Sequence, residues 1–235
     1  MSNALIELQD LRFHWPAQPL LLDIPHFAMQ PCERVFLKGP SGSGKTSLLG
    51  LLGGVQQPKH GQLKILEQNL NNLSQGARDQ FRADHCGFIF QQFNLLPFLN
   101  VLDNVSLACR FSKRRSQQAI QRHGSVAQAA QALLSSLGLA APLWQRRADQ
   151  LSIGQQQRVA AARALIGQPE LIIADEPTSA LDSDSRQAFL ELLFSECQSA
   201  GSGLLFVSHD QSLASLFDRS VSLLELNRAS QSPEL

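Results

Sequence analysis

A glycine-rich loop lies between an apolar segment and a leucine-rich one, and it limits the possible folds more than any other feature. Residues 34–38 read Arg-Val-Phe-Leu-Lys, and Gly39-Pro40-Ser41-Gly42-Ser43-Gly44-Lys45-Thr46 follows directly. The loop fits the pattern G-x-x-x-x-G-K-[S/T] at every fixed position, and leucines then recur up to Leu52. Because glycine has no Cβ, the loop can curl until its backbone N–H groups point inward at phosphate oxygens. The segment therefore predicts a strand, a phosphate-binding loop and a helix.

Side chains and the helix start strengthen this phosphate site. Lys45 brings a full positive charge to the β- and γ-phosphates, and Thr46 offers a hydroxyl to Mg²⁺, which prefers hard oxygen ligands. The partial positive charge at the helix start favours the same anion. Alone, such a loop indicates only an NTPase or a kinase. The predicted contact set is Gly39, Pro40, Ser41, Gly42, Ser43, Gly44, Lys45, Thr46 and Ser47.

Two carboxylates follow an unbroken apolar run further along the chain. Residues 171–174 read Leu-Ile-Ile-Ala, which predicts a strand buried on both faces, and Asp175 and Glu176 come next. In open α/β sheets, ligands bind outside the C-terminal ends of the strands. Asp175 is therefore predicted to hold Mg²⁺ through water, and Glu176 to polarise an attacking water as general base. The alternative is a charged strand end before Pro177.

Strands and helices alternate around these two motifs. Further strands are expected at 87–90 and 204–207, and helices at 46–52, 126–137, 155–166 and 189–197. This alternation favours an α/β fold with a mostly parallel sheet, a P-loop NTPase core. Four prolines, at positions 16, 19, 25 and 31, break the N-terminal region into short pieces that suit an antiparallel β layer.

A single domain over 1–235 is expected. Its nucleotide-binding core and β layer would comprise 1–92 and 168–226, and 93–167, which lacks a convincing strand, would form an inserted all-helical subdomain. Residues 227–235 are polar and predict a flexible tail.

Charge and hydropathy exclude two kinds of partner contact. Acidic and basic residues number 20 each, so the cationic surplus that favours nucleic acid is missing. No segment approaches the ~18 uncharged apolar residues that span a bilayer. If the protein works at a membrane, another chain must cross it.

A family resemblance becomes specific at Leu151-Ser152-Ile153-Gly154-Gln155-Gln156-Gln157-Arg158. This segment resembles the signature motif of ABC ATPases, usually L-S-G-G-Q. Asp175 to Asp182 resembles the family's acidic strand running into its D-loop, and Ser208-His209-Asp210 resembles the switch histidine. Gln91 resembles the Q-loop glutamine, with Gln92 as the alternative by a one-residue shift. All the motifs occur in family order, so the resemblance implies the ABC ATPase fold over essentially the whole chain.

The resemblance also implies how the residues act. Two copies would pack head to tail around two Mg-ATP, each ATP held by one copy's phosphate loop and by Ser152, Gly154 and Gln155 of the other. His209 would contact the γ-phosphate, Gln91 would touch Mg²⁺ or the water, and Asp182 would reach across the interface. Each copy would drive an integral membrane permease from the cytoplasmic face of the bacterial inner membrane, as a peripheral subunit.

Two positions depart from the family's pattern. Trp15 is the candidate for the aromatic that stacks on adenine, where tyrosine is usual, and Phe13 is the fallback. Ile153 replaces the first glycine of the signature, and a β-branched residue disfavours positive φ. A glycine-only conformation at Ile153 would therefore weaken the binding of ATP between two copies.

The subtype signals conflict. Residues 93–105, with Ala174 to Pro177, are similar to ATPases of the lipoprotein-release and macrolide-export type, and 93–105 would also dock the permease. Ser179-Ala180-Leu181-Asp182 is the form common in polar amino-acid importers. A soluble non-transport ABC ATPase is the further alternative. The basic run from Arg110 to His123 suits either anionic lipid headgroups or a solvated helical face.

Overall fold

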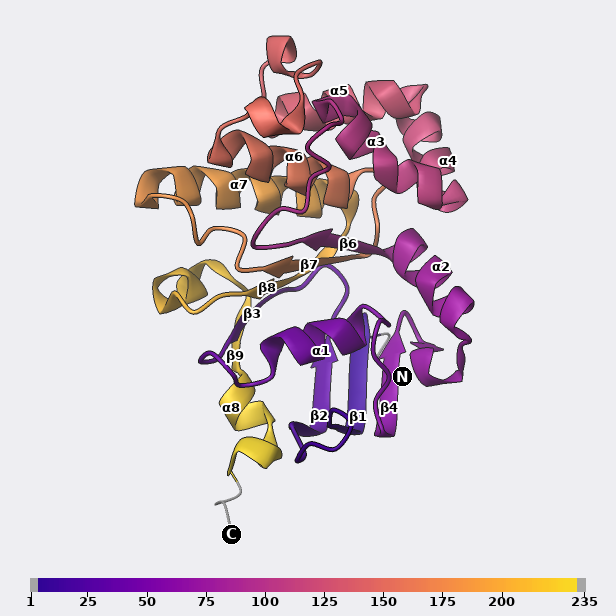
Figure 1. The fold of residues 1–235 in the computed structure, drawn as a ribbon, viewed down its shortest axis with the longest axis vertical. Coiled ribbons are helices and arrows are strands. Elements are labelled where there is room, and N and C mark those ends of the chain that lie inside the picture. The colour runs from indigo at the N-terminus through magenta and orange to yellow at the C-terminus, as the bar shows by residue number, and fades with distance from the viewer. Residues whose placement is uncertain (1–3, 232–235) are drawn as a thin grey trace. The chain divides into compact units, whose positions relative to one another are not determined.

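The computed structural model describes residues 4–231, which fall into two compact units. The first unit comprises residues 4–82 and 203–231, and the second comprises residues 83–202. The first boundary lies inside α2 (Gln75–His85), and the second lies just before β8 (Gly203–Val207). In Figure 1 the colour of the described residues runs from indigo on the N-terminal side to yellow on the C-terminal side.

An antiparallel sheet forms one part of the first unit. Its strands are β1 (Ile6–Phe13), β2 (Leu22–Met29), β4 (His60–Ile65) and β5 (Gln68–Asn69), in the order β2-β1-β4-β5. The predicted antiparallel layer is therefore confirmed, and Pro16, Pro19 and Pro31 lie outside its eight-residue strands β1 and β2. Pro25 lies inside β2, at the edge of the sheet, where a missing N–H breaks no ladder.

Parallel strands form the other part of the first unit. β3 (Arg34–Lys38) lies between β8 and β9 (Arg219–Ser222) and runs parallel to both. The rings of Phe36, Phe206 and Phe217 pack together, with centroids 5.1–6.2 Å apart. Besides the part of α2 up to Arg82, the unit contains the α-helices α1 (Lys45–Leu52) and α8 (Leu223–Leu226). α1 buries four leucines, at positions 48, 49, 51 and 52. The predicted strand–loop–helix is confirmed.

The C-terminal segment of the first unit is anchored, contrary to the expectation for residue 227. Asn227 is fully buried, and it follows α8. Its side-chain oxygen accepts from the N–H of Asp23 and its amide donates to the carbonyl of Leu21, both at 2.8 Å. The polar character of Asn227 therefore reflects buried hydrogen bonds, not solvent exposure. Residues 232–235 lie outside the described residues.

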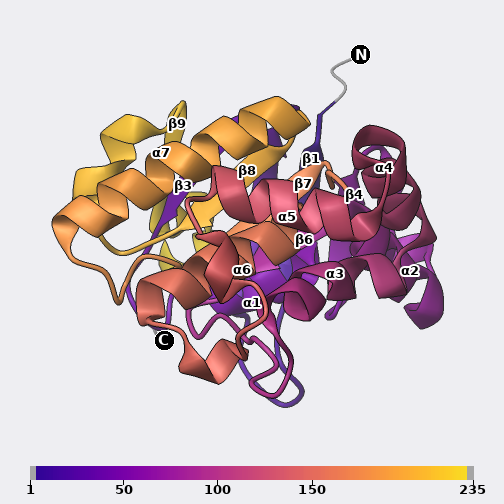
Figure 2. The ribbon, with the colours of Figure 1, turned by 90° about the horizontal axis from the view of Figure 1, so that it is seen from above.

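Helices dominate the second unit. Its strands β6 (Cys86–Ile89) and β7 (Leu171–Asp175) are parallel neighbours. Its helices are α3 (Val101–Phe111), α4 (Lys113–His123), α5 (Val126–Ser136), α6 (Ile153–Leu165) and α7 (Ser183–Ala200). α6 contacts α3, α5, α7 and β6, and is therefore the central helix of this unit (Figure 2).

The predicted absence of strands between 93 and 167 is confirmed for these residues, where only an isolated bridge joins Asn100 and Arg147. The compact unit is wider than the predicted helical subdomain, because β6, β7 and α7 pack with the same helices. Among residues 4–231, no helix combines the length and the apolar character that crossing a bilayer requires.

The basic run in α4 is not a uniform solvated face. Arg115 is only 3% exposed, and the Arg114 guanidinium pairs with Glu170. Arg110, at the end of α3, lies 3.6 Å from a carboxylate oxygen of Asp103. Arg110 and Arg114 are thus paired with carboxylates and Arg115 is buried, whereas Lys113 and Arg122 are exposed. Contact of these exposed cations with lipid headgroups stays a prediction.

Candidate nucleotide-binding site

The phosphate loop of the first unit joins β3 to α1. Gly44 is the N-cap of α1 and has a left-handed backbone, with φ of +96°. A Cβ at Gly44 would lie 2.8 Å from a methyl carbon of Leu22, so packing as well as backbone conformation requires glycine there. The Lys45 ammonium donates to the carbonyls of Gly39 and Pro40, at 2.7 and 2.9 Å. Lys45 therefore lies along the loop with its charge close to the loop backbone.

Three observations fit the loop to an anion. The first turn of α1 contains no acidic residue, and no side chain caps its N-terminal N–H groups. The Ser43 hydroxyl is buried and finds no hydrogen-bond partner among residues 4–231. A Cβ at Gly42 would meet nothing within 4 Å, so space is open there. A phosphate group supplies the acceptors that these donors lack.

His209 lies at the same edge of the first unit as the phosphate loop. β3 and β8 are parallel, with Leu37 opposite Val207. Gly39 and His209 each come two residues after these paired positions, and His209 is exposed. The predicted neighbourhood of the switch histidine and the phosphate loop is therefore present, while its contact with a γ-phosphate stays a prediction.

Trp15 follows β1 and is half-exposed, whereas Phe13 is only 2% exposed. Their rings meet edge to face, with centroids 5.2 Å apart. Phe13 pairs with Leu22, the residue packed against the position of Gly44. Trp15 therefore keeps part of its surface exposed, whereas buried Phe13 cannot offer a face to a base. Stacking of Trp15 on adenine stays a prediction.

The second unit presents its own edge of functional side chains. β6 and β7 are parallel, with Ile89 opposite Ala174. Gln91 and Glu176 each come two residues after these paired positions, so Gln91 lies at the same edge as Asp175 and Glu176. Gln91 is exposed and both carboxylates are half-buried. The structure thus brings three of the predicted catalytic and metal residues together within one unit.

Glu176 has an unusual backbone. Its φ is +46°, in the left-handed region that non-glycine residues rarely occupy. The N–H of Ser179 donates to its carbonyl, at 3.3 Å, and so begins the turn of 176–179. Such conformations cost about 1–3 kcal/mol and gather at active sites. The left-handed turn sends the Glu176 side chain away from the direction that a continued strand would give it.

The signature segment begins α6 with a capping box. The Ser152 hydroxyl accepts from the N–H of Gln155, at 3.4 Å, and the Gln155 side chain accepts from the N–H of Ser152, at 3.0 Å. Ile153 is the first residue of α6, and its φ is not positive. The site therefore does not use a glycine-only conformation at Ile153, whose side chain is 53% exposed.

Nothing within the second unit's described residues requires glycine at position 154. A Cβ there would meet only a methyl carbon of Leu181, at 3.9 Å, so its own unit leaves the position open. Asp182 lies next to Leu181 and caps α7, accepting from the N–H and the hydroxyl of Ser185 at 2.9 Å each. These hydrogen bonds lower the pKa of Asp182 from its ordinary value. Asp182 is therefore the N-cap of α7, and any role across an interface stays a prediction.

Two residues that shape this region had no motif to reveal them. Arg163, near the end of α6, donates to the carbonyls of Phe93 and Asn94, both at 2.6 Å. Asn104 is fully buried and bonds to both backbone groups of Leu96. Their partners are main-chain atoms, which leave no signature in a single sequence.

No group of three or more His, Cys, Asp or Glu side chains within residues 4–231 forms a metal cluster. Proteins usually hold Mg²⁺ through one or two carboxylates together with substrate phosphates and water. The residues present for it are the Thr46 hydroxyl, Asp175 and Gln91. Asp175 and Gln91 lie at one edge of their unit, and Thr46 lies in the first turn of α1.

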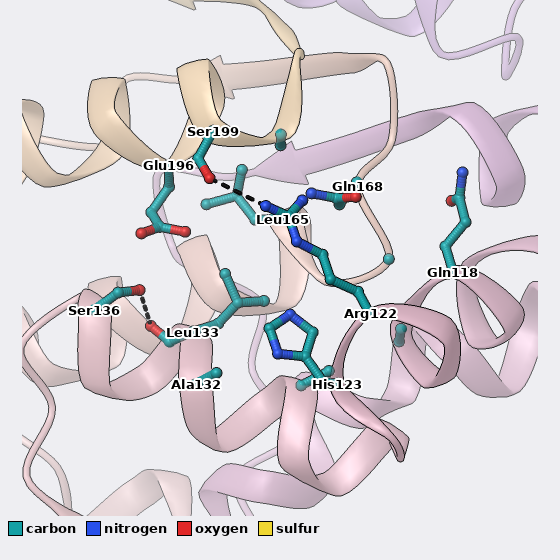
Figure 3. A pocket seen from close by; sticks show the side chains of 14 residues that line it. Gln118, Arg122, His123, Ala132, Leu133, Ser136, Leu165, Gln168, Glu196 and Ser199 are labelled. Carbon is teal, nitrogen blue, oxygen red and sulfur yellow. Dashed lines mark hydrogen bonds between the residues drawn. The ribbon is translucent and has the colours of Figure 1, made fainter.

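A pocket of about 190 Å³ lies elsewhere in the second unit, between α4, α5, α7 and the end of α6 (Figure 3). Arg122 reaches across it toward Ser199, at 3.4 Å, and Leu133 and Leu165 are among its apolar walls. None of the predicted site residues lines it, and its volume is small for a nucleotide. This pocket is therefore separate from the phosphate chemistry.

The motifs, the two site edges and the fold agree with the comparisons with known proteins. The model of the ABC transporter family matches residues 22–179, more than half of the chain. The chain belongs to the ABC transporter family as an ATP-binding subunit, and it is an ABC ATPase. Relatives of the lipoprotein-release and macrolide-export kinds match at 36–38% identity, which confirms the predicted subtype resemblance.

Three similar proteins illustrate this membership. The uncharacterized ABC transporter ATP-binding protein YbbA of Escherichia coli (strain K12) is 43% identical over 192 residues, covering 82% of this chain and 81% of its own. The lipoprotein-releasing system ATP-binding protein LolD of Novosphingobium aromaticivorans is 38% identical over 229 residues, covering 96% and 98%. The ATP-binding cassette MJ0796, solved as a dimer in a post-hydrolysis state bound to ADP and Pi, has a TM-score of 0.81 and 32% identity, with 95% of each chain covered.

Proposed function

We propose that this chain is the ATP-hydrolysing motor of an export or lipoprotein-extraction ABC transporter. Two copies bind two Mg-ATP between them and drive a separate membrane permease from its cytoplasmic side. The LolD relative, which matches along nearly its whole length, supports the transporter type. The MJ0796 cassette, solved as a dimer bound to ADP and Pi, supports the paired arrangement.

The observation that carries the proposal is that the N-termini of two helices, α1 and α6, suit anion binding. In the first unit, α1 begins without an acidic residue or a side-chain cap, beside Lys45 and the Ser43 hydroxyl, which has no hydrogen-bond partner within residues 4–231. In the second unit, α6 begins at an exposed Ser152, and its own unit leaves the space at Gly154 open. A helix start attracts anions through its N–H groups and dipole. One ATP held between the α1 start of one copy and the α6 start of the other uses both.

The chain's own residues then divide the chemistry. Lys45 and the loop N–H groups bind the β- and γ-phosphates, and Trp15 stacks on the base. Thr46, Asp175 and Gln91 would hold Mg²⁺, which would neutralise phosphate charge when bound. Glu176 accepts a proton from the attacking water, and His209 contacts the γ-phosphate. Gln91 orients the water, while Gln155 holds Ser152 in place through the capping box.

Glu176→Gln tests the general base. We expect turnover to fall by about 10²–10⁴-fold, because the amide cannot take the proton from water. Steady-state phosphate release measures turnover, and nucleotide affinity should change little. The matched control is Glu191→Gln, an exposed α7 carboxylate that accepts from Gln187. A loss below about threefold would remove Glu176 from this role.

Protein concentration tests the paired arrangement. Sites that form only between two copies make Mg-dependent hydrolysis rise more than linearly with protein concentration. Hydrolysis strictly proportional to protein concentration from dilute to concentrated solution would contradict it. Lys45→Ala should instead weaken ATP binding, since it removes a full charge from the loop. Unchanged nucleotide affinity in this variant would contradict the phosphate-loop assignment.

A further inference from the structure

Arg163 connects the central helix of the second unit to the loop that contains Gln91. One guanidinium nitrogen donates to the carbonyl of Asn94 and the other to that of Phe93, both at 2.6 Å. Charge-assisted hydrogen bonds of this length are among the stronger ones in proteins. Burial lowers the pKa of Arg163 from its ordinary value, so this cation is held at a desolvation cost.

The loop that Arg163 holds has a tight and strained backbone. The N–H of Phe93 donates to the carbonyl of Phe90, at 2.9 Å, and closes a turn around Gln91 and Gln92. Phe93 and Asn94 both have positive φ, +58° and +48°. Each left-handed non-glycine residue costs about 1–2 kcal/mol, and such strain persists only where the surroundings enforce it. Arg163 binds the carbonyls of these same two residues.

The helix that carries Arg163 also carries the signature serine. α6 is capped by Ser152, and Arg163 lies in its last turn. At 1.5 Å per residue these positions are about 16 Å apart along one continuous helix. The far end is fixed as well, because Arg115 donates to the carbonyls of Ala164 and Ile166. A rigid helix held in this way moves the Gln91 loop whenever its Ser152 end moves.

We propose that Arg163 is a positioning residue that sets the place of Gln91 by clamping the Phe93 and Asn94 carbonyls to α6. It makes the signature segment and the Gln91 loop move as one body, so that a displacement of either segment also displaces the other. The inference rests on the proposed function, because Gln91 acts on the nucleotide only there.

The chemistry of the clamp requires arginine. The two carbonyls belong to successive peptide groups, and the planar guanidinium presents one nitrogen to each. Lysine keeps the charge but concentrates it at one ammonium on a flexible stem. Arg163→Lys therefore retains the cation near the loop while losing the two-point hold.

The test is a double-mutant cycle on steady-state ATP turnover with Arg163→Lys, Gln91→Ala and the double variant. We expect Arg163→Lys to lower kcat about 10-fold through misplacement of Gln91, with the affinity for a fluorescent ATP analogue changed less than twofold. Because Arg163 acts only through Gln91, the double variant should turn over at the rate of Gln91→Ala alone. Independent effects would instead multiply, about 10-fold lower still.

Arg78→Lys is the matched control, because Arg78 also donates to two backbone carbonyls, those of Gly54 and Leu73, in the first unit. Its kcat should stay within twofold of the wild type. If Arg163→Lys does not fold, Arg163→Gln, which keeps one amide donor, replaces it in the same cycle.

The outcomes distinguish a failure of the proposed role of Gln91 from a failure of the Arg163 clamp. A Gln91→Ala variant at the wild-type rate overturns the proposed role of Gln91 and the clamp with it. A slow Gln91→Ala variant leaves that role standing. In that case a kcat for Arg163→Lys within twofold of the wild type, or multiplying effects in the double variant, overturns the clamp alone.

Discussion

Replacement of the buried Arg115 by methionine should strongly destabilise the second unit. Arg115 is 3% exposed, although it stands in a run of basic residues. Its guanidinium donates to the carbonyls of Ile166 and Ala164, at 2.7 and 2.6 Å, and to that of Arg163 at 3.2 Å. Helices leave the carbonyls of their last turn without intrahelical partners. Arg115 therefore supplies the hydrogen bonds that end α6, and burial lowers its pKa to about 10.

The magnitude follows from these bonds. Losing a buried partner of a charge-assisted hydrogen bond costs about 1.5–3 kcal/mol, and two of the bonds are short. Relief of the arginine's own desolvation offsets part of this, since a buried charge is itself costly. We expect Arg115→Met to lower the free energy of unfolding by about 3–4 kcal/mol. This is a large share of the 5–15 kcal/mol typical of a domain.

Urea denaturation monitored by far-UV circular dichroism measures this change, and hydrogen exchange of the α6 amides localises it. Arg122→Met is the matched control on the same helix, because Arg122 is exposed and its hydrogen bond to Ser199 is long, at 3.4 Å. That variant should change stability by less than about 0.5 kcal/mol. Equal stability losses in the two variants, or a loss below about 1 kcal/mol for Arg115→Met, would refute the reasoning.

Two further predictions concern the first unit. Gly44→Ala should destabilise this unit by about 1–3 kcal/mol, because the residue has a positive φ and its new methyl group meets Leu22. Gly42→Ala should cost less, because Gly42 also has a positive φ but lies in open space. Equal urea midpoints for the two variants would contradict this. Hydrogen bonds from Arg34 lower the pKa of Asp218 below its ordinary 3.8. The stability from this pair is present above that value and is lost as pH falls through the folded-state pKa. Asp218→Asn should thus lower the free energy of unfolding by less than about 1 kcal/mol at pH 7, since the ion pair is exposed. The stability difference between wild type and variant should shrink by pH 3. A difference that stays constant with pH would refute the role given to the Arg34–Asp218 pair.

Local patterns predicted much of the fold and the two site edges. The phosphate loop and the apolar strand before Asp175 are each encoded in a few adjacent residues, and each lies where the pattern placed it. Parallel strand pairing then brings His209 beside the loop and Gln91 beside the carboxylates, as the strand order of an α/β fold requires.

Tertiary contacts account for what could not be predicted. β9 reads Arg-Ser-Val-Ser, with no apolar run, and forms because β3 offers an open edge. Arg115 looks solvated in the sequence, and only the meeting of α4 with the end of α6 buries it. The left-handed backbone of Glu176 and the clamp by Arg163 depend on main-chain geometry that residue types do not encode.

The buried Asn227 limits how the chain can be engineered. Its side chain hydrogen-bonds to the N–H of Asp23 and to the carbonyl of Leu21. These two residues flank Leu22, which packs against Gly44. A deletion that removes residue 227 would take these hydrogen-bond partners away from the Asp23 N–H and the Leu21 carbonyl, close to the phosphate loop. An affinity tag or fluorescent fusion is therefore best joined beyond residue 231, where the anchor stays intact.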